Sequence, residues 1–292
     1  MSSTEPTTPT KSRPRWLLIG AFLVAGALAT AGIIALLVSV LEKKAEAQHP
    51  FFQVVALDET SFDAEVWGRN FPLQYESFKQ TSFMPEDEQV KRTPTAEDPR
   101  TVKSISKLEE DPRLVTMWQG YAFSVEYNEP RGHEYMLEDQ LLVKRVQAPF
   151  KQPGACLNCH TSLPGALANI GGDPAEAWAT MNKTPYAEAT KFADHPVQCI
   201  DCHDPQTNAL RITRPAFVEG IKEYKAGQGI KDYDVHTQAT AAEMRTFVCA
   251  QCHVEYYFAG DEKTLTFPLD KGLTVDYALA YYDEIAWSDF EL

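Results

Sequence analysis

One five-residue pattern occurs three times in this chain: two cysteines separated by two residues and followed directly by a histidine. The copies are CLNCH at 156–160, CIDCH at 199–203 and CAQCH at 249–253, and together they use all 6 cysteines of the 292 residues. The third copy continues as VEYYF, which adds a carboxylate and two phenols. Thiols, imidazoles, carboxylates and phenols bind metals or transfer protons, so these segments are the candidates for chemistry.

Three kinds of site could use paired cysteines. A structural zinc site needs four ligands, into which three pairs do not divide well. Disulfides and thioredoxin-like redox pairs need no histidine after the second cysteine. A c-type haem needs the whole pattern, since both thiols add to its vinyl groups and the adjacent histidine ligates the iron. Only 7 of the 292 residues are histidine. A histidine after all three pairs therefore has a chance of roughly one in a hundred thousand, which favours haem.

The haem interpretation assigns a role to each motif residue. It predicts haem c at all three motifs, with porphyrin supplying much of the apolar core and electrons passing between neighbouring haems. The residues predicted to bind haem covalently are Cys156, Cys159, Cys199, Cys202, Cys249 and Cys252. The predicted proximal iron ligands are His160, His203 and His253.

Four histidines outside the motifs are candidates for the sixth iron position. They are His49, His133, His195 and His236. An isolated histidine is more often a surface or structural residue than a ligand. His133 stands out among them, because it follows the stiff turn NEPRG.

Net charge and the N-terminal segment restrict the partners and the location. The chain has 27 Lys plus Arg against 41 Asp plus Glu, a formal net charge of -14. This acidity repels phosphate backbones, so nucleic acid is not expected as a partner, although simple solubility explains the acidity equally well. Residues 16–41 carry no charge, and a helix of this length reaches ~39 Å, enough to cross a ~30 Å hydrocarbon core.

The basic residues Lys11, Arg13 and Arg15 precede this apolar segment, which predicts that the N-terminus stays in the cytoplasm and that the body is periplasmic. The sequence AEA at 45–47 leaves cleavage of a signal peptide open. The resulting domain prediction has a cytoplasmic tail at 1–15, a transmembrane anchor or uncleaved signal at 16–41, a polar lead-in at 42–112 and a multihaem domain at 113–292.

The elements that must position the motifs are predicted to be mainly α-helices with long loops and little sheet. Asp173 and Pro174 suit a helix start, which predicts a helix through the 180s. Another helix is expected to begin near Thr213 and Pro215. Two further helices are expected at 237–248 and 275–287.

Three longer segments carry a family resemblance: CAQCHVEYYF at 249–258, NEPRGH at 128–133 and CIDCHDPQTNALRITRP at 199–215. With them, the chain from about Leu114 to its end resembles the pentahaem cytochrome c nitrite reductases of the ammonia-forming class. The resemblance implies reduction of nitrite to ammonium at the first haem, with electrons relayed by the others. His160 departs from the many members that have lysine at this position, while other members have histidine.

The resemblance also implies the remaining site residues. Arg145 and Tyr256 would be catalytic, whereas on their own they read as a surface or propionate-contacting arginine and a tyrosine packed on the third porphyrin. Glu255 and the backbone carbonyl of Tyr256 would bind calcium, and His133 would be the distal ligand of the third haem. The implied partners are nitrite, a membrane quinol-oxidising multihaem cytochrome as electron donor, and a second copy in a homodimer.

The family has five haems and this chain has three motifs. We therefore expect an N-terminal fragment of a longer protein, with a naturally short tri-haem protein as the alternative. The alternative function is a membrane-anchored electron-transfer cytochrome without a substrate of its own. Arg145 and Tyr256 favour the enzyme, because a pure electron carrier needs neither.

Overall fold

A computed structural model describes residues 15–46, 53–81, 83–84, 89–96, 101–119, 122–128, 131–147 and 151–286. Outside these ranges lie residues 1–14, His49, Glu129 and Pro130 of the NEPRGH segment, and the residues after 286. The chain divides into two compact units, Met1–Phe52 and Gln53–Leu292. All three motifs belong to the second unit, together with residues 53–112.

The first unit contains helix α1, Arg15–Glu46. Among the described residues it is the one helix that is long and apolar enough to cross a membrane, and an 18-residue window within Arg15–Ala45 has a mean hydropathy of 2.5. At ~1.5 Å per residue it is ~48 Å long. Lys43 and Lys44 lie in its last turn, where positive charge suits the helix dipole. The predicted apolar segment is therefore a helix, consistent with a membrane anchor or a signal sequence.

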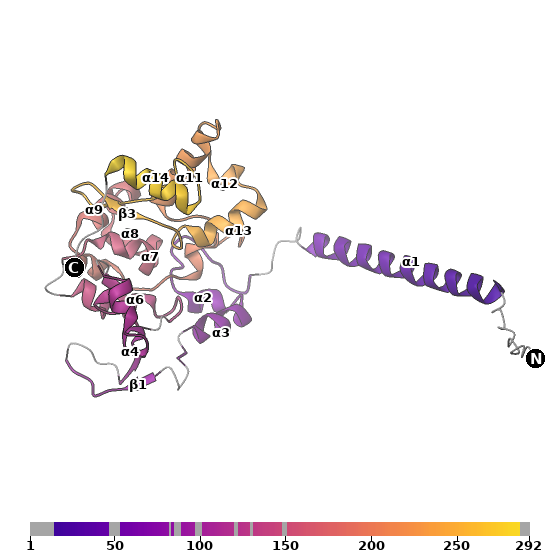
Figure 1. Ribbon diagram of the computed structural model, residues 1–292, viewed down its shortest axis with the longest axis horizontal. Helices are drawn as coiled ribbons and strands as arrows, with labels where there is room; N and C mark the ends of the chain where they lie inside the picture. Colours follow the sequence, from indigo (N-terminus) through magenta and orange to yellow (C-terminus); the bar gives the residue numbers. More distant parts are fainter. Residues whose placement is uncertain are drawn as a thin grey trace, which may run out of the picture. The chain divides into compact units, whose positions relative to one another are not determined.

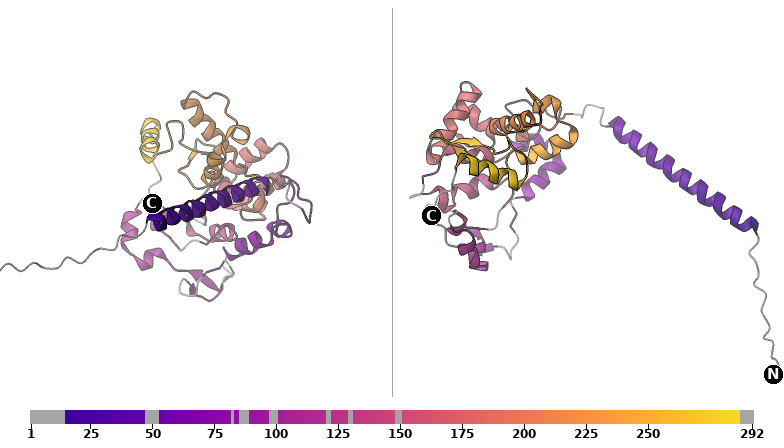
Figure 2. Two further views of the ribbon diagram at one scale, coloured as in Figure 1. Left: turned by 90° about the vertical axis from the view of Figure 1, so that its right-hand side faces the viewer. Right: turned by 45° about the horizontal axis from the view of Figure 1, so that its top comes forward.

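The second unit consists of short helices, long loops and two small sheets (Figure 1, Figure 2). Its α-helices are α2 (Ala64–Gly68), α3 (Pro72–Gln80), α4 (Lys107–Glu110), α5 (Arg113–Met117), α6 (Met136–Leu141), α7 (Leu157–His160), α8 (Leu163–Ile170), α9 (Pro174–Lys183), α10 (Tyr186–Ala189), α11 (Pro215–Gly227), α12 (Val235–Gln238), α13 (Ala241–Ala250) and α14 (Val275–Ile285). Its 3-10 helices are η2 (Ala122–Ser124), η3 (Lys144–Val146), η4 (Gly154–Cys156), η5 (Thr190–Phe192) and η6 (Cys199–Asp201).

The strands form two antiparallel pairs. They are β1 (Gln89–Lys91) with β2 (Val102–Ser104), and β3 (Tyr257–Ala259) with β4 (Thr264–Thr266). In the second pair Tyr257 lies opposite Thr266. The predicted fold class, mainly helical with little sheet, is confirmed.

Local sequence signals explain where the longer helices begin. Helix α9 starts at Pro174, and the Asp173 carboxylate accepts a hydrogen bond from the backbone N–H of Ala175 at 2.9 Å. Proline at the first position costs no hydrogen bond, because that N–H has no partner inside the helix. Helix α11 likewise starts at Pro215. Both starts were predicted.

The predicted helix at 237–248 is wrong at its start, because α13 begins only at Ala241. Thr240 and Glu243 form a capping box there. The Thr240 hydroxyl accepts from the N–H of Glu243 at 3.2 Å, and the Glu243 carboxylate accepts from the N–H of Thr240 at 2.8 Å. This reciprocal pair satisfies two backbone donors and fixes the helix start. The predicted helix at 275–287 is α14, which ends at Ile285.

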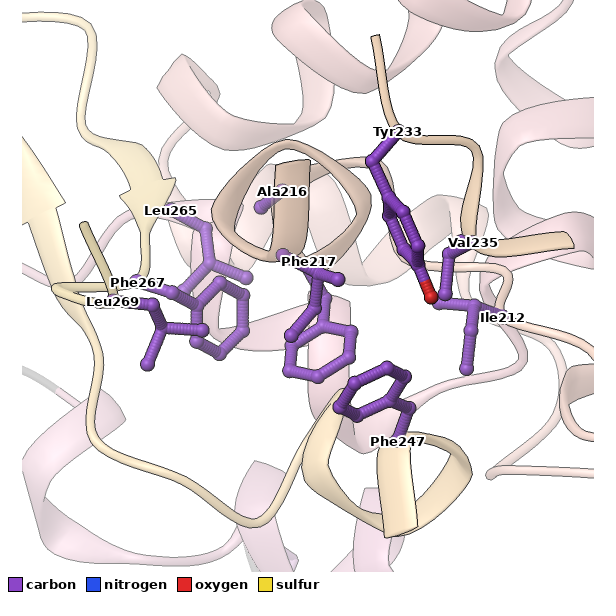
Figure 3. Packing of buried hydrophobic residues seen from close by; sticks show 10 residues of the cluster. Ile212, Ala216, Phe217, Tyr233, Val235, Phe247, Leu265, Phe267 and Leu269 are labelled. Carbon is purple, nitrogen blue, oxygen red and sulfur yellow. The ribbon is translucent and has the colours of Figure 1, made fainter. Parts of the chain in front are cut away.

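Three apolar clusters form the described core, two of which share a contact with Trp178, and each contains residues of one motif or of the helix that carries it. Leu157 of the first motif is fully buried in one cluster, and Ile200 of the second motif is fully buried in another beside Trp67. The third cluster surrounds Phe217, whose ring packs edge-on against Phe247 of α13 at 6.0 Å and against Phe267 at 5.3 Å (Figure 3). Aromatic pairs in this geometry stabilise a core beyond the area they bury. The motifs are thus anchored to packed peptide.

Candidate functional site

Each C-x-x-C-H motif forms one helical turn. The first motif occupies η4 and α7, the second occupies η6 and the residues after it, and the third lies at the end of α13. In the second and third motifs the histidine N–H donates to the carbonyl of the first cysteine, at 2.9 Å and 3.0 Å. All six cysteines are free thiols. The turn therefore brings two thiols and an imidazole together, as covalent haem attachment requires.

Two motif histidines are held through one ring nitrogen. His160 Nδ1 lies 3.2 Å from the Met136 carbonyl, and His203 Nδ1 lies 3.1 Å from the Asn208 carbonyl. A carbonyl only accepts, so these contacts select the tautomer that carries the proton on Nδ1. The other nitrogen, Nε2, is then the unprotonated one that can bind a metal. Both residues fit the role of a proximal iron ligand.

The third motif histidine faces His133. The ring centres of His133 and His253 are 6.3 Å apart, with an angle of 45° between the ring planes. A metal between two imidazoles separates their centres by ~6 Å, because each metal–nitrogen bond is ~2 Å long and each centre lies ~1 Å beyond its nitrogen. Although His133 is exposed overall, burial of its ring, with the nearby His253, lowers its pKa. The spacing of the two ring centres is the spacing that an iron between them would require.

The other two described histidines have different surroundings. His236 is exposed on α12. The backbone carbonyl of His195 accepts from the Thr161 hydroxyl at 2.5 Å and from the Ser162 N–H at 2.9 Å. These two hydrogen bonds attach the backbone at His195 to the two residues directly after the first motif.

A cavity of about 190 Å³ lies beside the first motif. Its lining includes His160 and Arg145, the latter on η3. The Arg145 guanidinium lies 5.3 Å from the centre of the Phe123 ring, a cation–π contact that limits its movement. Burial lowers the pKa of His160 to about 4, and the positive charge of Arg145 contributes. The imidazole is therefore neutral at neutral pH, the form that binds metals.

Tyr256 lies near the same residues, although it follows the third motif. Desolvation raises the pKa of its phenol, and the thiols Cys159 and Cys156 and the guanidinium of Arg145 lie close enough to influence it. Its side chain is nevertheless 44% exposed, and its ring centre lies 5.7 Å from that of Phe258. The fold thus gathers Arg145, His160 and Tyr256 into one region.

Glu255 has a single described polar contact, a hydrogen bond of 2.9 Å from the Tyr282 hydroxyl. Calcium prefers about six to eight oxygen ligands. Within the described ranges, no three His, Cys, Asp or Glu side chains come together in a group that could hold a metal ion. Glu255 and the Tyr256 carbonyl alone do not form a calcium shell.

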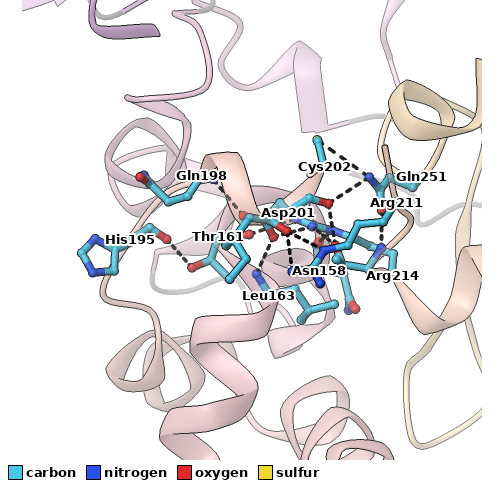
Figure 4. A network of polar contacts seen from close by, with 12 residues as sticks. Asn158, Thr161, Leu163, His195, Gln198, Asp201, Cys202, Arg211, Arg214 and Gln251 are labelled. Carbon is cyan, nitrogen blue, oxygen red and sulfur yellow. Dashed lines mark hydrogen bonds and ion pairs between the residues drawn. The ribbon is translucent and has the colours of Figure 1, made fainter. Parts of the chain in front are cut away.

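The three motifs meet at a buried set of polar residues that the sequence reasoning missed. We call this set the polar hub. It consists of Asn158, Asp201, Thr213, Arg214 and Gln251 (Figure 4). Asn158, Asp201 and Gln251 each occupy the second variable position of one motif, and they are 0%, 0% and 1% exposed. The sequence carried one signal for this set. The second variable position is polar in all three motifs, whereas the first variable position is apolar.

Arg214 is the centre of the hub and is 1% exposed. Burial alone would lower its pKa, but Asp201 and the thiols Cys252, Cys159 and Cys202 raise it overall, so the guanidinium stays charged. The neighbouring Cys252 thiol, together with burial, raises the pKa of Cys159. One thiol from each motif therefore lies around a single buried cation.

Comparisons with known proteins agree with these features. The family model described as cytochrome c552 matches residues 63–292. The cytochrome c-552 of Bacteroides fragilis is 37% identical over 288 residues, covering 96% of this chain and 53% of the relative. The cytochrome c-552 of Haemophilus influenzae is 30% identical over 296 residues, covering 94% and 50%.

A solved structure is also similar, the catalytic subunit of cytochrome c nitrite reductase from Desulfovibrio desulfuricans, described with two calcium sites. It matches with a TM-score of 0.57 and 28% identity, over 78% of this chain and 49% of that one. The chain spans about half the length of the curated relatives it matches. With three motif turns that fit haem c and a family model matched over residues 63–292, the chain belongs to the cytochrome c552 family.

Proposed function

We propose that this chain carries the substrate pocket of a cytochrome c nitrite reductase that reduces nitrite to ammonium. The observation that supports the proposal most is the cavity beside the first motif, in which the Arg145 guanidinium adjoins His160. A cation next to the ligand of a redox-active iron suits a small anionic substrate. The similar structure from Desulfovibrio desulfuricans is a nitrite reductase.

The motif residues would hold the cofactor. Cys156, Cys159 and His160 would attach and ligate haem c at the first motif, and the second and third motifs would do the same. When bound, haem c supplies the redox chemistry, which the protein itself cannot provide.

Arg145 would bind the substrate. Its forked guanidinium offers several N–H donors and a fixed charge, which hold and orient nitrite in the cavity. The Phe123 ring behind the guanidinium limits its movement. Tyr256 would donate a hydrogen bond from its hydroxyl to the substrate oxygens, and its raised pKa keeps that proton in place at neutral pH.

The second and third motifs would relay electrons. The third motif lies against both others, since Cys252 adjoins Cys159 of the first motif and Gln251 Nε2 lies 4.0 Å from Cys202 Sγ of the second. A six-electron reduction needs repeated electron delivery to one pocket, and adjacent redox centres provide it. A carrier without a substrate would need the relay but neither Arg145 nor Tyr256 beside the first motif, which makes the electron-transfer alternative the weaker proposal.

The remaining parts of the proposal concern location and partners. We place the second unit on the periplasmic side of the inner membrane, with α1 as its anchor or as a cleaved signal. The donor would be a membrane quinol-oxidising multihaem cytochrome, and the full-length enzyme would be a homodimer. Calcium bound through Glu255 would need further ligands beyond Glu255 and Tyr256.

The test is Arg145→Ala in the full-length, haem-loaded gene product. We expect ammonium production from nitrite with a reduced viologen dye to fall on the order of 100-fold, as when one preorganised donor to a developing charge is removed. Haem content and absorption spectra should not change. The control is Lys144→Ala, which removes an adjacent exposed cation from the same turn. Equal rates in both variants would contradict the proposed pocket.

A further inference from the structure

The polar hub binds the first motif from both sides through Arg214. Arg214 Nε donates to the Asn158 carbonyl at 2.8 Å, and Nη2 donates to the Thr161 carbonyl at 3.0 Å. These carbonyls belong to the residues immediately before Cys159 and immediately after His160. The guanidinium therefore brackets the dipeptide that supplies the second thiol and the imidazole.

The same guanidinium contacts the second motif. Arg214 Nη1 donates to Asp201 Oδ1 at 2.5 Å and to the Thr213 hydroxyl at 2.7 Å. The Asp201 carboxylate also accepts from the N–H of Leu163 at 3.0 Å and from the N–H of Gln198 at 2.8 Å. Its negative charge is therefore fully paired and hydrogen-bonded, as burial requires.

The third motif joins the hub through Gln251. Its side-chain carbonyl accepts from the N–H of Thr213 at 3.0 Å, and its amide donates to the Asp201 carbonyl at 3.4 Å and to the Val248 carbonyl at 3.0 Å. Gln251 therefore connects the third motif to the second motif and to the residue beside Arg214.

A buried ion pair is a poor way to gain stability alone. Removing two charges from water costs several kcal/mol per ion, and apolar residues of similar volume often stabilise as well or better. A buried ion pair is useful instead where it favours one arrangement of the chain over alternative arrangements. In this chain the arrangement is the relative placement of three motifs, each of which already has its own apolar cluster.

We infer that Arg214 is a positioning residue for the first motif, holding the Cys159–His160 dipeptide in register with the second and third motifs. Its planar fork serves acceptors in several directions, which a lysine ammonium cannot reproduce from the same stem. The orientation of the His160 imidazole, and with it the ligand field and reduction potential of the group bound there, depends on that fork. The inference requires haem c at the motifs and does not require that nitrite is the substrate.

The test compares three variants of the haem-loaded protein. Arg214→Lys keeps the charge and loses the fork. Thr213→Val removes one hub hydroxyl at nearly constant shape and serves as the milder variant if Arg214→Lys fails to fold. The matched control is Arg211→Lys, since Arg211 donates to the Ile200 carbonyl at 3.1 Å and 2.9 Å and pairs with Glu59, contacts that concern only the second motif.

The readouts are the electron paramagnetic resonance signal and the midpoint potential of the first-motif haem, assigned by its change in His160→Ala. We expect a broadened signal and a shifted potential in Arg214→Lys, a smaller change in the same direction in Thr213→Val, and no first-motif change in Arg211→Lys. Unchanged first-motif signals in Arg214→Lys and Thr213→Val at full haem content, with only the unfolding temperature lowered, would overturn the inference and leave Arg214 a structural residue.

Discussion

Tyr256 differs from phenylalanine by one oxygen, and the proposed chemistry depends on that oxygen. We predict that Tyr256→Phe lowers kcat for nitrite reduction on the order of 100-fold, because a donor near the substrate is lost. The ring should keep its contact with Phe258, so haem content should not change. The measurement is ammonium formed from nitrite by the full-length, haem-loaded gene product.

The neighbouring Tyr257→Phe is the matched control for this prediction. The Tyr257 hydroxyl lies 2.7 Å from the Tyr281 hydroxyl, so its loss should reduce stability and leave the nitrite rate near that of the wild type. A Tyr256→Phe enzyme as fast as the control would mean that the catalytic phenol has been placed on the wrong residue.

At the level of single residues, the feature that the sequence alone identified is the repeated C-x-x-C-H motif. Its cysteines and histidines were predicted as haem residues because covalent haem attachment would require this spacing. The role of Arg214 was not predicted, because in sequence it is only the residue before Pro215. Its partners Asn158 and Thr161 belong to the first motif segment, and Asp201 belongs to the second motif. Patterns in a single sequence do not show which distant positions are in contact.

Among the elements, α9 and α11 were predicted because their start signals are local and contain proline. The start of α13 was missed because the Thr240–Glu243 capping box was not weighed. Glu243 also binds outside its own helix, since its carboxylate accepts from Lys225 Nζ of α11 at 2.5 Å. One side chain therefore caps α13 and ties it to the helix at the centre of the Phe217 cluster.

This double role makes a pH-dependent prediction for Glu243. The hydrogen bonds from Lys225 and Thr240 lower the pKa of Glu243 to about 2. A lowered pKa in the folded state means that its contribution to stability is present above its usual pKa of ~4.3 and is lost as the pH falls towards 2. We predict that Glu243→Gln lowers the unfolding temperature at pH 7 and that the difference between the two proteins shrinks below about pH 4 and disappears as the pH approaches 2.

Thermal unfolding followed by circular dichroism across this pH range is the measurement. The control is Glu188→Gln, because Glu188 pairs with Lys191 on an exposed helix end where ion pairs contribute little. A difference between wild type and Glu243→Gln that stays constant from pH 7 to pH 3 would show that the carboxylate charge is not what stabilises α13.

For the whole second unit, the main feature is that its peptide core is divided. Three apolar clusters adjoin three motifs, and the polar hub joins the motifs to one another. The sequence analysis predicted neither the division of the peptide core nor the convergence of the motifs. Further contacts join the unit outside the hub: the Ala64 N–H donates to the Gln198 side chain at 2.7 Å, which ties the region before residue 113 to the segment that begins the second motif.

Each attached porphyrin would extend the apolar cluster beside its motif, so haem would contribute to the packing of the unit as well as to its chemistry. We predict that the 292-residue chain, matured in a host that attaches c-type haem, shows three haem additions by intact mass spectrometry. The additions should survive acid–acetone extraction, since thioether bonds hold them. Replacing Cys199 and Cys202 by serine should reduce the count by one. Zinc in place of iron, or haem lost on extraction, would exclude covalent attachment at these motifs.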